Sequence, residues 1–177
     1  ITRAQVSAGS ATKKGKVIGV AMAVEGWKGY FPLAHPGGGN FDEKVFKRQL
    51  KKILDLPCDK IFHNAIYDIG WLSAMGLEVK GRIIDTMIAA PLIDENKRNY
   101  SLKEIAQEYI GETKSEAGLY EAAKDFGVDA KAEMHLLPAM YVGPYAEQDA
   151  AVTLKLWQAL KVEIIKQELT SVFNLES

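Results

Sequence analysis

Two pairs of polar residues in this sequence have the spacing that brings side chains together on a helix. Asn64 and Asp68 follow a short strand-like run at 60–62, and Tyr145 and Asp149 lie in a later helical segment. Residues four apart share one face of a helix, so each pair would lie together on one rim. Ligands of open α/β sheets gather at the carboxyl ends of strands, where the first pair is expected. The pattern therefore indicates a ligand-binding rim that includes a carboxylate and an amide.

Ordinary structural roles are the alternative for both pairs. Asn64 could cap the helix that follows it, with Asp68 as a solvated charge. Tyr145 and Asp149 could combine packing with a favourable charge near the positive end of a helix. Asp85 also ends a predicted strand. We expect it to cap the next helix rather than to serve as a third metal ligand.

The composition fits one globular domain of mixed charge. The chain has 177 residues, 47% of them hydrophobic, and its 22 basic and 23 acidic residues leave a net charge of −1. Nucleic acid would therefore have to bind a local patch. Cys58 is the single cysteine, which excludes an internal disulfide and a cysteine-rich zinc site, and the three histidines lack zinc spacing. No apolar run is long enough to span a membrane, so we expect an intracellular protein with no membrane partner.

Apolar periodicity predicts an α/β fold on a mixed sheet. Strands are expected at 16–24, 30–33, 61–62 and 81–85. Helices are expected at 41–54, 65–75, 86–93, 115–126 and 144–168. The first two strands read as a hairpin, and the last two as a parallel pair with a right-handed crossover. Ser101 and Glu104 form a capping-box pattern for a further helix that Gly111 ends, and Pro144 is expected in the first turn of the last helix.

Four segments carry a family resemblance: Asn64-x-x-Tyr67-Asp68, Asp85-Thr86-Met87, Ser101-Leu102 and the run at 145–154. In this order they resemble the 3′–5′ proofreading exonuclease domain of family A DNA polymerases, of the polymerase I type found in bacteriophages and bacteria. The likeness covers residues 16–168. It implies a ribonuclease H-like fold, with a mixed five-stranded sheet between helices. It also implies an enzyme that hydrolyses nucleotides from the 3′ end of single-stranded DNA.

The resemblance further implies two Mg²⁺ or Mn²⁺ ions held by four carboxylates. Asp149 would bind one ion, and Asp68 would help to hold the second. Two such ions can turn a water into hydroxide, hold the scissile phosphate and stabilise the departing oxygen. Tyr145 would orient the attacking water, and Asn64 would touch the nucleotide near the 3′ end.

Three neighbours of these residues are further candidates for substrate binding. His63 lies beside the asparagine and could meet the nucleotide. Tyr67 and Trp71 could stack on bases. Basic residues around 44–52 are either a solvated face or a track for the phosphates of a single strand.

The first motif of the family, an Asp-x-Glu on the opening strand, is missing. No acidic residue precedes Glu25, and residues 8–10, the segment nearest to the expected place, are Ala-Gly-Ser. The motif has been deleted or replaced, or the sequence omits residues, or the domain has lost catalysis. Because two carboxylates compensate a pair of dications poorly, two-metal binding is expected to be weak. The alternative function is a catalytically impaired domain that binds DNA or supports a polymerase domain.

We expect residues 1–177 to form one exonuclease-like domain, a fragment of a larger DNA polymerase. Residues 169–177 would begin the connection to a polymerase domain. The expected partners are the 3′ end of single-stranded DNA and that polymerase domain in the same chain. We expect a monomer in the cytoplasm of a bacterium or a phage-infected host. A ribonuclease of the related superfamily is a further alternative.

Overall fold

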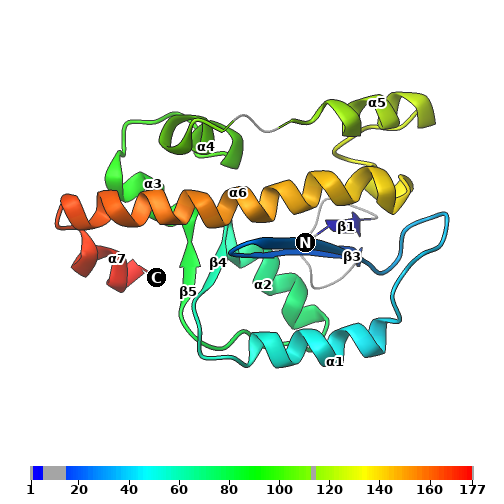
Figure 1. Cartoon of the computed structure of the whole chain (residues 1–177), viewed down its shortest axis with the longest axis horizontal. Helices are drawn as coiled ribbons and strands as arrows, with labels where there is room; N and C mark the ends of the chain where they lie inside the picture. Colours follow the sequence, from blue (N-terminus) through cyan, green and yellow to red (C-terminus); the bar gives the residue numbers. More distant parts are fainter. Residues whose placement is uncertain (1, 6–14, 113–114, 177) are drawn as a thin grey trace.

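Helix α6 (Ala139–Lys166) is the element around which the chain folds. The computed structural model describes residues 2–5, 15–112 and 115–176, so residues 8–10, nearest to the expected first motif, lie outside the described residues. Helix α6 extends along the longest dimension of the molecule (Figure 1). It contacts strands β2, β3 and β4 and four other helices, α3 (Thr86–Ile93), α4 (Leu102–Ile110), α5 (Ala117–Phe126) and α7 (Thr170–Glu176).

The described strands are β1 (Thr2–Gln5), β2 (Gly15–Val24), β3 (Trp27–Pro32), β4 (Lys60–Phe62) and β5 (Ile83–Asp85). The first three form an antiparallel sheet in the order β1-β2-β3, and β4 pairs with β5 in parallel. These pairings confirm the α/β class, the hairpin and the parallel pair. The sequence predicted one mixed sheet. Among the described residues the same strands form two sheets, because β4 and β5 pair only with each other.

The remaining helices are α1 (Glu43–Leu54), α2 (Ala65–Ala74) and a short 3-10 helix (Met134–Leu136). Side-chain caps explain three of the helix starts, those of α1, α3 and α4. The Ser101 hydroxyl accepts a hydrogen bond from the N–H of Glu104 at 3.4 Å, as the capping-box pattern predicts. Gly111 ends α4 with a φ of 66°, a left-handed conformation that glycine adopts without a steric cost.

The start of α6 differs from the prediction. The helix begins at Ala139, so Pro144 lies inside it rather than in its first turn. A proline inside a helix removes one backbone hydrogen bond and crowds the preceding turn, which is why the sequence suggested a start there. Packing outweighs this cost, since Val142 and Ala146 on either side are buried. Tyr145 and Asp149 are consequently further from the positive end of the helix than expected.

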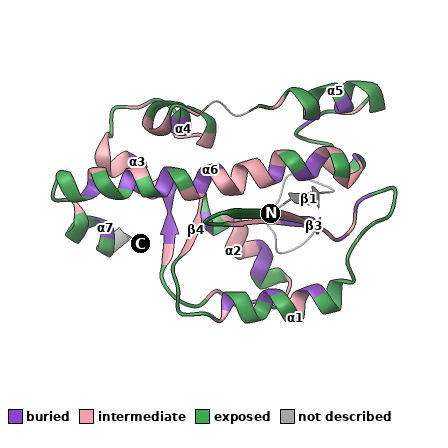
Figure 2. Cartoon of the chain, viewed as in Figure 1, coloured by how far each residue is buried: buried purple, intermediate pink, exposed green. Residues whose placement is uncertain are grey.

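Three apolar clusters hold these elements together. One joins the hairpin to α1 and α2, a second joins α3, α4, α6 and α7, and a third joins α5 to the first turns of α6. The outer surface of α1 is exposed, whereas buried residues recur along α6 (Figure 2). No helix within the described ranges is long and apolar enough to cross a membrane.

Candidate active site

Asn64 forms the turn between strand β4 and helix α2. Its backbone is left-handed, with φ 70° and ψ 62°, and α2 begins at the next residue. Asparagine tolerates this conformation better than most residues other than glycine. Its side chain makes no capping hydrogen bond, and the residue is exposed. Asn64 therefore occupies the N-cap position, as the structural alternative predicted, but without a side-chain cap, and its amide is accessible at the carboxyl end of β4.

Asp85 supplies the missing cap. Its Oδ1 accepts hydrogen bonds from the N–H groups of Asn64 and Met87, both at 2.9 Å, and its Oδ2 accepts one from Ala65 at 2.7 Å. The predicted cap of α3 is confirmed, and the same carboxylate also caps α2. A carboxylate has about four lone-pair sites, so three backbone donors leave little capacity for a metal ion. The geometry therefore favours the structural role of Asp85 over that of a metal ligand.

His63 is half-buried between the two helix starts. Its Nδ1 lies 2.9 Å from the hydroxyl oxygen of Thr86, which donates its own proton to the carbonyl of Phe62 at 3.0 Å. Because that hydroxyl proton is already used, the histidine is the donor in the first bond and carries a proton on Nδ1. His63 thus connects the end of β4 to the start of α3. Its predicted contact with substrate stays a prediction.

Tyr67 and Asp68 lie in the first turn of α2, and both are half-buried. The ring of Tyr67 meets that of Trp71 edge-on, with the centroids 6.5 Å apart. Trp71 itself is only 3% exposed and belongs to the core between the hairpin, α1 and α2. Its predicted stacking on a base is therefore wrong, because core packing occupies the ring. Tyr67 remains the aromatic candidate on this helix.

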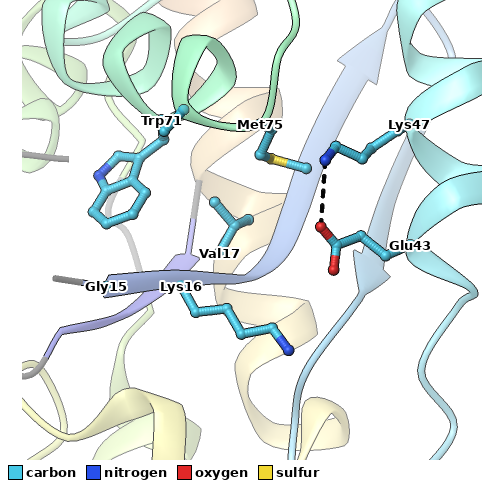
Figure 3. Close-up of a pocket in the computed structure, with 8 residues that line it drawn as sticks. Gly15, Lys16, Val17, Glu43, Lys47, Trp71 and Met75 are labelled. Carbon is cyan, nitrogen blue, oxygen red and sulfur yellow. Dashed lines mark ion pairs between the residues drawn. The ribbon is translucent and has the colours of Figure 1, made fainter. Parts of the chain in front are cut away.

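A small cavity of about 140 Å³ lies beside Trp71, between α1, α2 and the start of β2 (Figure 3). The ammonium group of Lys47 is 3.5 Å from the carboxylate of Glu43 at its edge. Trp71 and Lys47 line this cavity, but Asn64, His63, Tyr67, Asp68, Tyr145 and Asp149 do not. The candidate site is therefore elsewhere, at the starts of α2 and α3 and along α6.

Tyr145 lies on α6, one turn before Asp149, as predicted. Its phenol oxygen accepts a hydrogen bond from the ammonium of Lys131 at 2.5 Å, and the same ammonium contacts Glu116 at 2.7 Å. Burial opposes the charge on Lys131, yet the hydrogen bonds with Glu116 and Tyr145 raise the pKa of this ammonium above its ordinary value. The phenol is therefore held by a cation in the loop that follows α5.

The two acidic residues on this part of α6 have different surroundings. One carboxylate oxygen of Glu147 accepts a hydrogen bond from the backbone N–H of Tyr30 at 3.0 Å, which ties α6 to strand β3. Asp149 is half-buried, and its Oδ1 atom is buried. Its backbone carbonyl accepts from the hydroxyl of Thr153 at 2.8 Å. Asp149 is therefore the better placed of the two carboxylates for a role in a site.

Strand β4 contacts both α2, which carries Asp68, and α6, which carries Tyr145 and Asp149. Among the residues that the structure describes, no group of three or more His, Cys, Asp or Glu side chains could hold a metal ion. Asp85 and Glu147 are committed to backbone donors. Asp68 and Asp149, the carboxylates implied as metal ligands, supply too little negative charge to fit a two-metal site.

Lys131 and Glu116 are the residues near the site that the sequence did not single out. They lie in separate loops, 14 and 29 residues before Tyr145, and no short spacing links them to it. Tyr145 also borders a cavity of about 290 Å³ between α5 and α6, whose other lining residues include Ser115, Tyr141 and Gln148. Only the fold brings these groups to the phenol.

The chain is similar in sequence and in fold to known nucleases and DNA polymerases. The family model described as 3′–5′ exonuclease, for the exonuclease domain of family A DNA polymerases, matches residues 12–165. A solved structure described as the apo form of a nuclease superposes with a TM-score of 0.65 at 20% identity, over 91% of this chain and 70% of that one. A DNA complex of Pol1 from M. smegmatis gives a TM-score of 0.63 at 19% identity, over 90% of this chain and 23% of that one. These two likenesses support the ribonuclease H-like fold.

Curated relatives extend the match to whole polymerases. A DNA-directed DNA polymerase of Pseudomonas phage M6 is 38% identical over 91% of this chain, and DNA polymerase I of Pseudomonas aeruginosa is 33% identical over 86%. The aligned parts are 25% and 17% of those relatives, so the chain spans a quarter or less of their length. From the family match over most of its length, the chain belongs to the 3′–5′ exonuclease family of family A DNA polymerases.

Proposed function

We propose that this chain accepts the 3′ end of single-stranded DNA between the start of α2 and the Tyr145–Asp149 turn of α6. The observation that carries the proposal is the exposed amide of Asn64, presented by a left-handed turn at the carboxyl end of β4. The family match includes both this turn and α6. Asn64, His63 and Tyr67 would contact the terminal nucleotide, and Tyr145 would lie beside the scissile phosphate.

The primary candidate reaction is removal of nucleotides from that end. Members of the family generally depend on divalent metal ions. Asp68 and Asp149 would be the protein ligands, and an ion bound there would supply charge stabilisation for the phosphate. The two negative charges of these carboxylates neutralise only part of the four positive charges of two divalent ions. Hydrolysis by this chain is therefore proposed to be slow.

The second candidate is a domain that holds the 3′ end without cutting it. The sequence feature that favours it is the lack of any acidic residue before Glu25. The arrangement of Asp85 and Glu147 agrees with it, because neither carboxylate is available to replace the missing ligands. Such a domain would support a polymerase domain by retaining a frayed primer end.

The relatives are full-length polymerases, and we propose that this chain is one domain of such an enzyme. Residues 169–177 would lead toward a polymerase domain. The first part of that segment packs against the domain, since Phe173 is 2% exposed and its ring stacks on that of Trp157 with the ring centres 5.3 Å apart. We propose that the domain is a monomer and that its nucleic-acid partner is DNA.

A nuclease assay separates the two candidates. The chain is incubated with a 5′-labelled single-stranded oligonucleotide and Mg²⁺ or Mn²⁺, beside Asp149→Ala, Asp68→Ala and the surface control Asp125→Ala. Shortening from the 3′ end that both site variants abolish, and the control retains, supports the enzyme. Equal shortening of the oligonucleotide by the wild type and by Asp149→Ala refutes the enzymatic candidate.

Binding and substrate choice complete the test. Tighter binding of linear than of circular DNA of the same sequence, without cleavage, supports the second candidate. No preference for an end refutes the proposed site as a whole. Preferential cleavage of the matching RNA would overturn the assignment to DNA.

A further inference from the structure

We infer that Asp85 is a positioning residue that sets the geometry of the DNA-binding rim without touching DNA or metal, an inference that rests on the proposed function. The residue is 7% exposed at the end of β5. Its carboxylate is hydrogen-bonded by backbone donors of two different helix starts, in α2 and in α3. It therefore acts through the backbone around Asn64.

The hydrogen bonds fix the left-handed turn. The first N–H groups of a helix have no partner within the helix, and the N–H groups of Asn64 and Ala65 belong to this set for α2. Ala65 is only 5% exposed, so water reaches its amide poorly. The carboxylate of Asp85 is the acceptor for both groups, and the Asn64 side chain makes no capping hydrogen bond of its own. The asparagine amide is thereby left for another partner.

The same carboxylate joins the two strand-to-helix turns. Oδ1 binds Asn64 after β4 and Met87 after β5, so the turns cannot move independently. The Thr86 hydroxyl adds a second link, because it donates to the carbonyl of Phe62 and accepts from His63. Any shift of these two hydrogen-bonded turns would rotate the first turn of α2, where Tyr67 and Asp68 lie. Three proposed substrate and metal contacts thus depend on one buried side chain.

Asp85→Asn is the informative substitution, because it keeps size and removes one acceptor. With its oxygen in the place of Oδ1, its NH₂ group faces the N–H of Ala65, donor against donor. In the flipped orientation the N–H groups of Asn64 and Met87 lose their acceptor instead. Either orientation loosens the turn. Asp42→Asn is the matched control, because Asp42 caps α1 by accepting from Val45 at 2.8 Å and is not in the rim.

The first measurement is the affinity for a linear oligonucleotide divided by that for the circular form, in EDTA and again in Mg²⁺. Asp85→Asn should lower this ratio about three- to tenfold, as expected for loss of one or two hydrogen bonds that orient the rim. The reduction should be the same with and without metal, and Asp42→Asn should leave the ratio unchanged. A reduction seen only with Mg²⁺ would make Asp85 a ligand and overturn the inference.

The second measurement needs no DNA. Amide hydrogen exchange at Asn64, Ala65 and Met87 should be at least several-fold faster in Asp85→Asn than in wild type, while Asp42→Asn accelerates exchange only at the start of α1. Unchanged protection at the three amides would overturn the inference. A wild-type chain without end preference would refute the proposed function. Amide exchange would still decide whether Asp85 fixes the turn.

Discussion

The ammonium group of Lys131 lies 2.5 Å from the phenol oxygen of Tyr145 and 4.3 Å from the centre of its ring. Glu116 holds the same ammonium from another direction, with its Oε1 at 2.7 Å. Because an ammonium can only donate, the phenol oxygen accepts this bond. Lys131 thereby orients the tyrosine that we propose to lie beside the scissile phosphate.

Substitution of Lys131 should affect DNA binding through Tyr145. Lys131→Met is expected to weaken binding of a 3′-ended oligonucleotide about two- to fivefold, since a partly exposed charge contributes modestly. If the effect passes through the phenol, the losses in Lys131→Met and Tyr145→Phe will not add in the double variant. Fluorescence anisotropy measures all three affinities. Lys124→Met, on the exposed face of α5, is the control for a lost positive charge. Fully additive losses would contradict the coupling.

Metal ions should stabilise the chain little. Because Asp68 and Asp149 are the two carboxylates proposed as ligands, the affinity for Mg²⁺ is expected to be low, and a ligand stabilises a fold only where its concentration approaches or exceeds its Kd. Millimolar Mg²⁺ should therefore raise Tm by less than about 1 °C. Differential scanning fluorimetry with and without EDTA checks this. A rise of several degrees that Asp149→Asn abolishes would show that the ligand set is more complete than the described residues suggest.

Local signals explain why much of the fold was predictable. The caps at Ser101 and Asp85 and the stop at Gly111 are set by residues within a few positions of the helix ends. The hairpin and the parallel pair follow from apolar runs and the lengths of their connections. Each of these features depends on neighbours in the sequence, so a pattern of residue types was enough to predict it.

The features that the sequence predicted wrongly or missed depend on contacts between segments that are distant in the sequence. Pro144 continues α6 because the surrounding residues are buried against other elements, which outweighs its local preference. Trp71 faces the core rather than a base because α1 and the hairpin cover it. Lys131 reaches Tyr145 only through the fold. The left-handed Asn64 was missed because its capping partner, Asp85, lies 21 residues away.

The packing of α7 should contribute strongly to stability. Phe173 is 2% exposed, stacks on Trp157, and lies 5.2 Å below the guanidinium of Arg82. Phe173→Ala should lower the free energy of unfolding by roughly 3–5 kcal/mol, the usual cost of removing a buried ring. The neighbouring Val172→Ala, at a position 41% exposed, should change it by less than about 0.5 kcal/mol. Urea unfolding of both variants tests the contrast. Equally small decreases in the free energy of unfolding of the two variants would mean that α7 does not pack against the domain in solution.

The two ring nitrogens of His35 contact Tyr30 in strand β3 and Leu137, which lies just before α6. It is 4% exposed, its Nδ1 lies 2.8 Å from the carbonyl of Leu137, and its Nε2 lies 2.6 Å from the hydroxyl of Tyr30. Since a carbonyl can only accept, Nδ1 carries the proton and Nε2 accepts from the tyrosine. Burial lowers the pKa of this imidazole below its ordinary value of 6.5, against a smaller opposite effect of the Leu137 carbonyl. His35 is therefore neutral in the folded chain.

This neutral histidine should make the fold less stable in mild acid. Below pH 6.5 the unfolded chain binds a proton that the folded chain resists, so the unfolded state gains protons and stability falls with pH. The contribution is complete above the unfolded pKa and is lost progressively as pH drops toward the folded value. In thermal unfolding, Tm should decrease from about pH 7.5 to pH 5, and this decrease should be smaller in His35→Gln than in the wild type. A slope unchanged in His35→Gln would assign the pH dependence to other groups.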